Sequence, residues 1–226
     1  MLPAISLYSA APIPEPDGMT TYNRIAGQNL DRLKALCDGV FAVAMTLLVL
    51  DLRAPAAEAV GTEADLWRAL LALSPRLLTY LMSFITLGIF WIGQQTQHDH
   101  LAKSDRSYAF INLVFLMAVT LVPFSTALLA EFITFRVALV VYWANIAALG
   151  LIIAAQIYRA RHFGLLKPDL PPAHVAALLR RVAIAQGLYA FGALLCIFSN
   201  WWSIGFIVVV QLIYAVAPRR GFLARL

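Results

Sequence analysis

The sequence predicts an all-α membrane protein with six transmembrane helices in each subunit. Hydrophobic residues make up 62% of its 226 residues and charged residues 13%, which is about half the charged share of a typical soluble domain. The apolar residues gather into blocks of about 18 or more, enough to cross a hydrocarbon core of about 30 Å as a helix. The basic residues alternate in density between successive loops, as in proteins that cross a membrane several times.

The hydrophobic blocks divide the chain into six spans separated by short polar connections. In order, the expected spans are Ala35–Leu52, Leu70–Gln94, Tyr108–Leu129, Phe132–Tyr158, Ala173–Ser199 and Trp202–Ala217. Pro123 interrupts the third block, so a re-entrant turn between the third and fourth spans stays open. We expect residues 1–31 to form a largely disordered tail, residues 32–217 the six-helix transmembrane domain, and residues 218–226 a short basic C-terminus.

The loop charges predict the orientation of these spans. Thirteen of the 17 basic residues fall before the first span, in the second loop, in the fourth loop with the start of the helix after it, and at the C-terminus. By the positive-inside rule this side is cytoplasmic, so both termini are expected in the cytoplasm of a multi-pass protein of the cell membrane. The net charge of +5 is thus a topology signal within a lipid bilayer, and we expect no nucleic-acid partner.

The first span has two distinct faces. At 100° per residue, Val43, Leu47 and Leu50 fall within about 60° of one another, and Thr46 lies about 60° to the side of Val43. Asp38 lies about 140° from Val43. A carboxylate at membrane depth is costly unless it is paired, so we expect Asp38 to point into the packing of the protein's own helices and to find donors there.

The residues alone leave the role of both faces open. An apolar stripe at helical spacing is most often simple core packing, although it can also face a symmetry axis. Asp38 is either a structural anchor or part of a proton or ion relay.

One segment of this span resembles a known family. Arg32 is followed, after three residues, by Leu36-Cys37-Asp38 and the run Gly39-Val-Phe-Ala-Val-Ala-Met-Thr-Leu-Leu48. This is similar to the Arg-x-x-x-Phe-Ser-Asp motif and first helix of the transmembrane protein 175 family, the lysosomal and prokaryotic potassium channels. The Phe and Ser of the motif are replaced here. The resemblance continues at Ser83–Trp91, Asn112–Met117 and Leu121–Leu129.

The resemblance implies a homotetramer in which the first helix of each of four subunits lines a central pore. Its first constriction would be Val43, with further apolar layers at Leu47 and Leu50, and Thr46 matches a position implicated in potassium preference. The permeant ion would be K⁺, weakly preferred over Na⁺, with no cofactor and no metal other than K⁺ in transit. A ring of apolar side chains can gate such a pore by dewetting.

The resemblance also implies a network of hydrogen bonds that holds the first helix. Arg32, Asp38, Trp91 and Asn112 match positions in that network, and Gln95 stands where the family often has a histidine. Glutamine does not titrate, and Cys37 in place of Ser is a weaker hydrogen-bonding group. We therefore expect gating to differ from the family pattern.

Other functions find less support in the residues. His98-Asp99-His100 could suggest a metal site, but without a further ligand cluster a solvated loop is the better interpretation. The sequence has no Gly-rich phosphate loop, nucleophile motif or paired membrane carboxylates, so we expect no enzymatic activity. A secondary transporter of a small ion or solute is the main alternative, and a structural membrane protein is a third.

Overall fold

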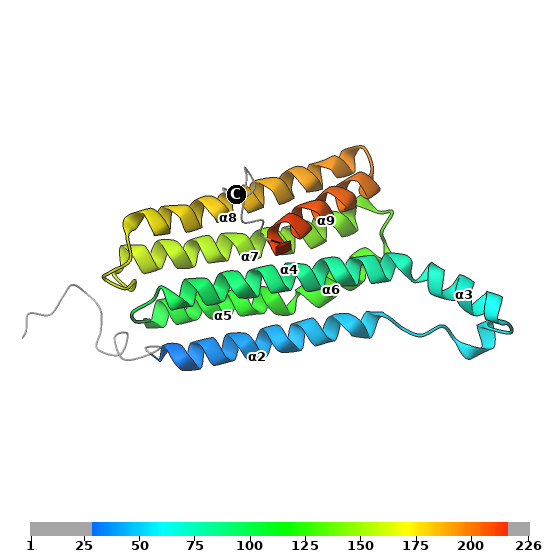
Figure 1. The fold of residues 1–226 in the computed structure, drawn as a ribbon, viewed down its shortest axis with the longest axis horizontal. Coiled ribbons are helices and arrows are strands. Elements are labelled where there is room, and N and C mark those ends of the chain that lie inside the picture. Colours follow the sequence, from blue (N-terminus) through cyan, green and yellow to red (C-terminus); the bar gives the residue numbers. More distant parts are fainter. Residues whose placement is uncertain (1–28, 217–226) are drawn as a thin grey trace, which may run out of the picture.

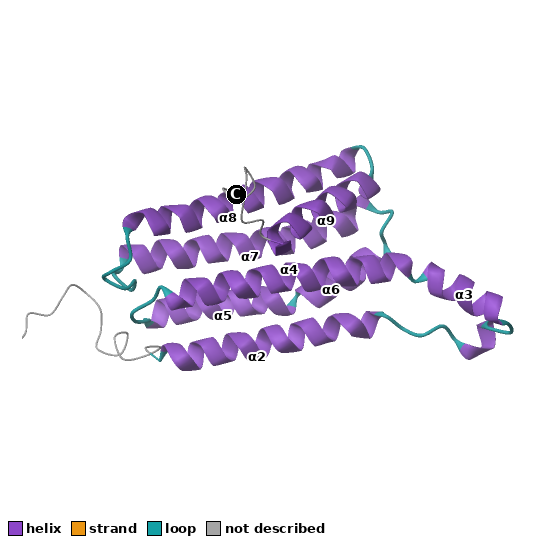
Figure 2. Ribbon diagram, in the orientation of Figure 1, coloured by secondary structure: helices purple, strands orange, loops and turns teal. Residues whose placement is uncertain are grey.

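The computed structural model describes residues 29–216, and in this part of the chain all regular elements are helices (Figures 1 and 2). The longer helices are α2 (Leu30–Leu48), α4 (Ser74–Asp99), α5 (Arg106–Thr120), α6 (Val122–Glu131), α7 (Arg136–His162), α8 (Pro172–Leu194) and α9 (Asn200–Val216). The shorter elements are α3 (Glu63–Ala72) and the 3₁₀ turns η1 (Val49–Asp51), η2 (Ala57–Ala59) and η3 (Leu195–Ile197).

The helical class and the approximate positions of the spans agree with the sequence prediction. Within the described residues, five helical stretches are long and apolar enough to cross a membrane, and α9 is a shorter apolar helix. The five stretches are Leu30–Asp51, Ser74–Asp99, Arg106–Glu131, Arg136–His162 and Ala173–Ile197. The expected boundaries differ from these by up to five residues, because hydropathy falls gradually where a helix leaves the apolar region.

The start of the second span was predicted wrongly. Leu70 belongs to α3, a separate ten-residue helix that projects beyond the end of the bundle (Figure 1) and has no buried residue. The membrane-length helix α4 begins only at Ser74, with Pro75 in its first turn. Proline is tolerated there because the first turn has no partner for its missing N–H. Residues 70–72, at the end of α3, had been counted as part of the following span.

The third predicted span is one stretch with a break, and the re-entrant turn is not formed. α5 and α6 follow one another through Leu121, and Pro123 lies in the first turn of α6. The proline ends the hydrogen-bond ladder of α5 and starts a new helix in nearly the same direction (Figure 1). The chain then reaches the far end of the bundle at Glu131 before α7 returns.

Helix α2 lies along one side of the bundle, where it packs on α4, α5 and α6 (Figure 1). On the other side, α7 packs against α5, α6 and α8, and α9 fills the space between α8 and α4. The core therefore runs through the middle of the bundle and leaves one face of α2 without a neighbour among residues 29–216.

The predicted domain boundaries fall largely outside the described residues. Residues 1–28 and 217–226 lie outside them, so the expected tail and basic C-terminus stay predictions. The boundary at residue 31 falls inside α2, because the side chain of Asn29 caps this helix by accepting a 2.9 Å hydrogen bond from the backbone N–H of Arg32.

Candidate ion path along helix α2

One face of α2 is fixed against the rest of the subunit. Its buried residues recur every three or four positions and are Leu33, Cys37, Phe41, Ala44 and Leu48. This spacing places them in a single stripe along the helix. The ring of Phe41 meets that of Phe115 on α5 at a centroid distance of 6.0 Å. The position and rotation of α2 are therefore set by apolar packing.

The opposite face of α2 carries the residues of the predicted ion path. Val43 is 57% exposed, Leu47 43% and Leu50 66%. Thr46 lies beside them, also exposed, and its hydroxyl donates a 2.8 Å hydrogen bond to the carbonyl oxygen of Val43. The structure thus brings the four predicted residues onto one unoccupied surface, and the local polar group on it is satisfied by its own helix.

Asp38 is held by α4, although it is not buried as expected. The indole nitrogen of Trp91 donates a 2.8 Å hydrogen bond to Asp38 Oδ1, and Gln95 Nε2 lies 3.4 Å from the same oxygen. The residue is nevertheless exposed in the subunit and borders a cavity of about 220 Å³ between α2 and α4. The prediction that Asp38 is buried was wrong, because its two donors are not buried themselves: Trp91 is half-buried and Gln95 is exposed.

Asn112 of α5 is the centre of a buried network that reaches four helices. Its Oδ1 accepts hydrogen bonds from Gln94 Nε2 at 2.7 Å and Gln156 Nε2 at 3.1 Å, and its Nδ2 lies 3.2 Å from Cys37 Sγ. These contacts join α2, α4, α5 and α7. Gln94 and Gln156 were not predicted as members of this network. A glutamine inside an apolar span is nevertheless a signal, because its amide group needs a hydrogen-bond partner there.

Arg32 is not brought into this network. Its side chain is exposed and makes no hydrogen bond or ion pair with residues 29–216. Its backbone N–H donates to the side chain of Asn29. The cross-helix ion pair near this end is made by Lys34 instead, whose Nζ lies 2.7 Å from Asp99 Oδ1 on α4.

A second buried polar cluster, which was not predicted from the sequence, joins four helices at the centre of the bundle. Ser83 and Thr86 of α4 each lie 3.3 Å from the hydroxyl of Tyr142 on α7. Gln211 of α9 donates to Thr86 at 2.5 Å, and Thr126 of α6 donates to Ser83 at 2.7 Å. Four helices are thus linked by buried side-chain hydrogen bonds, although the amide oxygen of Gln211 has no partner among the described residues.

The side chains of His98, Asp99 and His100 do not converge. His98 is buried next to Gln94, Asp99 pairs with Lys34, and the His100 Nδ1 atom lies 2.6 Å from the carbonyl oxygen of Thr96. Within the described residues, no group of three histidine, cysteine or acidic side chains is arranged to hold a metal ion.

The sequence of this chain, α2 included, matches a known protein family. A family model for the endosomal/lysosomal potassium channel TMEM175 matches residues 32–123. A potassium channel of Streptomyces collinus is 34% identical over 194 residues, which cover 83% of this chain and 84% of that protein. This chain belongs to the TMEM175 family.

Two further similarities within the TMEM175 family cover the same part of the chain. A potassium channel of Chamaesiphon minutus is 33% identical over 189 residues, which cover 82% of this chain and 93% of that protein. The crystal structure of a lysosomal potassium-selective channel TMEM175 homolog from Chamaesiphon minutus matches with a TM-score of 0.72, over 83% of this chain and 96% of that chain. The family match begins at Arg32, so it includes the exposed stripe of α2 and Asp38.

Proposed function

We propose that this chain is the subunit of a potassium channel, in which α2 of each of four copies lines a central pore. The observation that carries the proposal is the exposed stripe of Val43, Leu47 and Leu50 on a helix whose opposite face is fully packed. The named potassium channels in its family support the same function.

The exposure of Asp38 supports polar surroundings rather than lipid on the side of α2 that borders α4. Its carboxylate is accessible about 140° around the helix from Val43, and a charge facing hydrocarbon is costly. A neighbouring subunit or a water-filled vestibule provides the polar surroundings that this group needs. Packing of α2 against three further copies of itself covers the apolar stripe, while Asp38 keeps its hydrogen bond to Trp91 on α4.

In this arrangement the stripe forms successive apolar rings around the ion path. Four copies of Val43 form the first constriction, and Leu47 and Leu50 form further layers toward the other end. A narrow apolar neck expels water and stops hydrated ions, so a small widening is enough to open it. The Thr46 hydroxyl lies between these layers and contributes to a weak preference for K⁺ over Na⁺.

The proposed assembly is a homotetramer in the cell membrane with both termini in the cytoplasm. Figure 1 shows the start of α2 at the same end of the bundle as the α4–α5 and α7–α8 connections. Those connections and the adjoining helix ends carry basic residues, among them Lys103, Arg161 and Lys167. Conduction by this route needs no cofactor besides the permeant ion, and it makes and breaks no covalent bond.

Flux through the purified protein tests this proposal. The protein is reconstituted in liposomes loaded with K⁺ or with Na⁺, and efflux down each gradient is compared with that from protein-free liposomes. We expect passive efflux that is faster for K⁺ than for Na⁺. Saturable uptake coupled to a second ion would support a secondary transporter instead, and an absence of flux would leave a structural role.

A further inference from the structure

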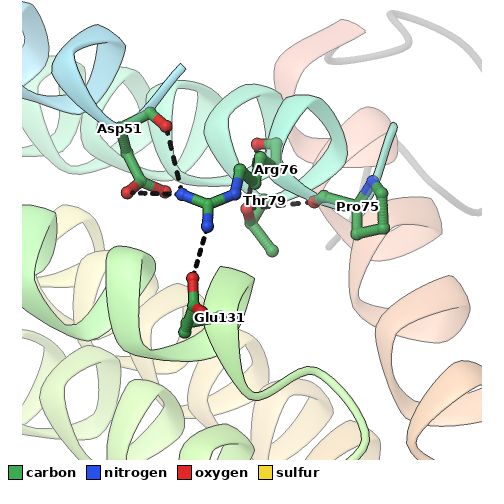
Figure 3. Close-up of polar contacts among 5 residues, drawn as sticks. All are labelled: Asp51, Pro75, Arg76, Thr79 and Glu131. Carbon is green, nitrogen blue, oxygen red and sulfur yellow. Dashed lines mark hydrogen bonds and ion pairs between the residues drawn. The ribbon is translucent and has the colours of Figure 1, made fainter. Parts of the chain in front are cut away.

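Arg76 links three elements at the end of the bundle where α2 terminates (Figure 3). Its Nη1 atom lies 3.3 Å from Asp51 Oδ1 and 3.4 Å from the carbonyl oxygen of Asp51. Its Nη2 atom forms an ion pair with Glu131. Asp51 ends η1, the continuation of α2, while Arg76 lies in the first turn of α4 and Glu131 is the last residue of α6.

The chemistry of this cluster suits a mechanical link. The planar guanidinium carries several donors in a fixed fork, so one arginine can hold two carboxylates at once. The side chains of Arg76 and Asp51 are only 30% and 27% exposed, so their attraction is less screened than that of a surface pair. Both the side chain and the backbone of Asp51 are engaged, which restrains the chain itself.

Apolar packing contributes little at this end of α2. The turn η1 has no buried residue, and the side chains of Val49 and Leu50 are exposed. Beyond it, residues 52–56 form no regular element. The contacts from Arg76 are therefore the polar link between this turn and the rest of the described bundle, and they act one residue after Leu50.

Building on the proposed function, we propose that Arg76 is a positioning residue that fixes the Leu50 layer at the far mouth of the ion path. By holding Asp51 against α4 and α6, it sets the direction in which Leu50 points toward the axis. Arg76 also offsets one of the two carboxylate charges of the cluster. Its loss frees the turn and leaves two uncompensated carboxylates in each subunit, which attract K⁺ and Na⁺ alike.

Bi-ionic recordings with a set of substitutions at Arg76, and at Arg68 as a control, test this role. R76Q removes both links between Arg76 and the two carboxylates. We expect the K⁺/Na⁺ permeability ratio to fall about twofold, which is near the lower end of the effects that mutations have on coupling between distant sites. R76K keeps the charge without the fork and is expected to lie between R76Q and the wild type. R68Q is the matched control, because Arg68 forms an exposed ion pair with Asp65 on α3 and is expected to leave the ratio unchanged.

Two further variants separate positioning from charge. D51N weakens the link to α2 and keeps the pair of Arg76 with Glu131, whereas E131Q removes a carboxylate and keeps the link to α2. If Arg76 acts by position, D51N lowers the permeability ratio more than E131Q does. Equal effects of D51N and E131Q would overturn the positioning role in favour of simple electrostatics.

Hydrogen exchange of residues 49–55 gives a readout that does not depend on conduction. We expect faster exchange in R76Q and D51N than in the wild type and R68Q. A conducting wild type with an unchanged permeability ratio in both R76Q and D51N would overturn the inference about Arg76 alone. A wild type that conducts nothing overturns the proposed function. Exchange of residues 49–55 in R76Q and D51N that matches the wild type would overturn the link itself.

Discussion

The indole nitrogen of Trp91 donates a 2.8 Å hydrogen bond to a carboxylate oxygen of Asp38, and this joins α2 to α4 on a side of α2 that faces away from the proposed ion path. The carboxylate stays exposed in the subunit, so the hydrogen bond determines which way it points. The same oxygen also receives the longer contact from Gln95. The pair therefore holds a charged group in place without burying it.

Replacing Trp91 with phenylalanine is expected to destabilise the protein by about 1–3 kcal/mol, because the hydrogen bond to a charged group is lost. The melting temperature of the detergent-solubilised protein, followed by size-exclusion chromatography, measures the change. W143F is the matched control, since the indole nitrogen of Trp143 has no partner among the described residues. Equal losses in W91F and W143F would show that ring packing, and not the bond to Asp38, is responsible.

Replacing Val43 with alanine or asparagine is expected to raise conductance and lower K⁺/Na⁺ selectivity, because a smaller or polar ring rehydrates the neck. Single-channel recordings in planar bilayers measure both quantities. V209A is the control, because Val209 on α9 is 55% exposed, close to the 57% of Val43. Currents through V43A and V43N that match those of the wild type would remove Val43 from the constriction.

Replacing Cys37 with serine is expected to raise the melting temperature. Cys37 Sγ lies 3.2 Å from Asn112 Nδ2, and a hydroxyl is a stronger hydrogen-bonding group than a thiol at such a site. Cys196 is also buried but makes no hydrogen bond with the described residues, so C196S is expected to give no gain. A fall in stability for C37S would show that the larger sulfur atom is needed for packing.

Stability at acid pH is expected to depend on Asp105. Burial acts to raise the pKa of this carboxyl, but the hydrogen bonds from Arg159 and from the backbone N–H of Tyr108 outweigh it and hold the pKa below its ordinary value. Because the folded-state pKa is the lower one, the stabilisation is present above the unfolded-state pKa of about 4 and is lost as pH falls through the folded-state value.

The variant D105N is therefore expected to melt at a lower temperature than the wild type near neutral pH and to lose less stability on acidification. Melting temperatures between about pH 7 and pH 3 measure this dependence. D99N is the control, because the ion pair of Asp99 with Lys34 is exposed and such pairs contribute about 0–1 kcal/mol. Parallel acid profiles for D105N and the wild type would contradict the assignment.

Much of the fold could be predicted, because hydropathy and helical periodicity are local properties of the chain. The apolar blocks indicated the spans, and the wheel of the first span separated Val43, Leu47 and Leu50 from Asp38. The short helix α3 was missed because its apolar residues continue those of α4 in sequence, and Pro75 was not recognised as the start of a new helix.

The polar partners could not be predicted in the same way. Gln156 meets Asn112 across 44 positions in the sequence, and Gln211 meets Thr86 across 125. No local pattern specifies which polar side chains of different helices will meet. A glutamine in an apolar span shows only that a partner is needed.

By itself, the sequence determined a helical membrane protein and the residues that share the stripe on its first span, because both follow from composition and from 3.6 residues per turn. Tertiary structure decided which face of α2 is covered, that Asp38 is held at the surface by Trp91, and that Arg76 joins Asp51 to Glu131. These outcomes depend on how whole helices pack. Apolar contacts such as that between Phe41 and Phe115 set the rotation of each helix, and its polar groups then pair with whatever that rotation brings within reach.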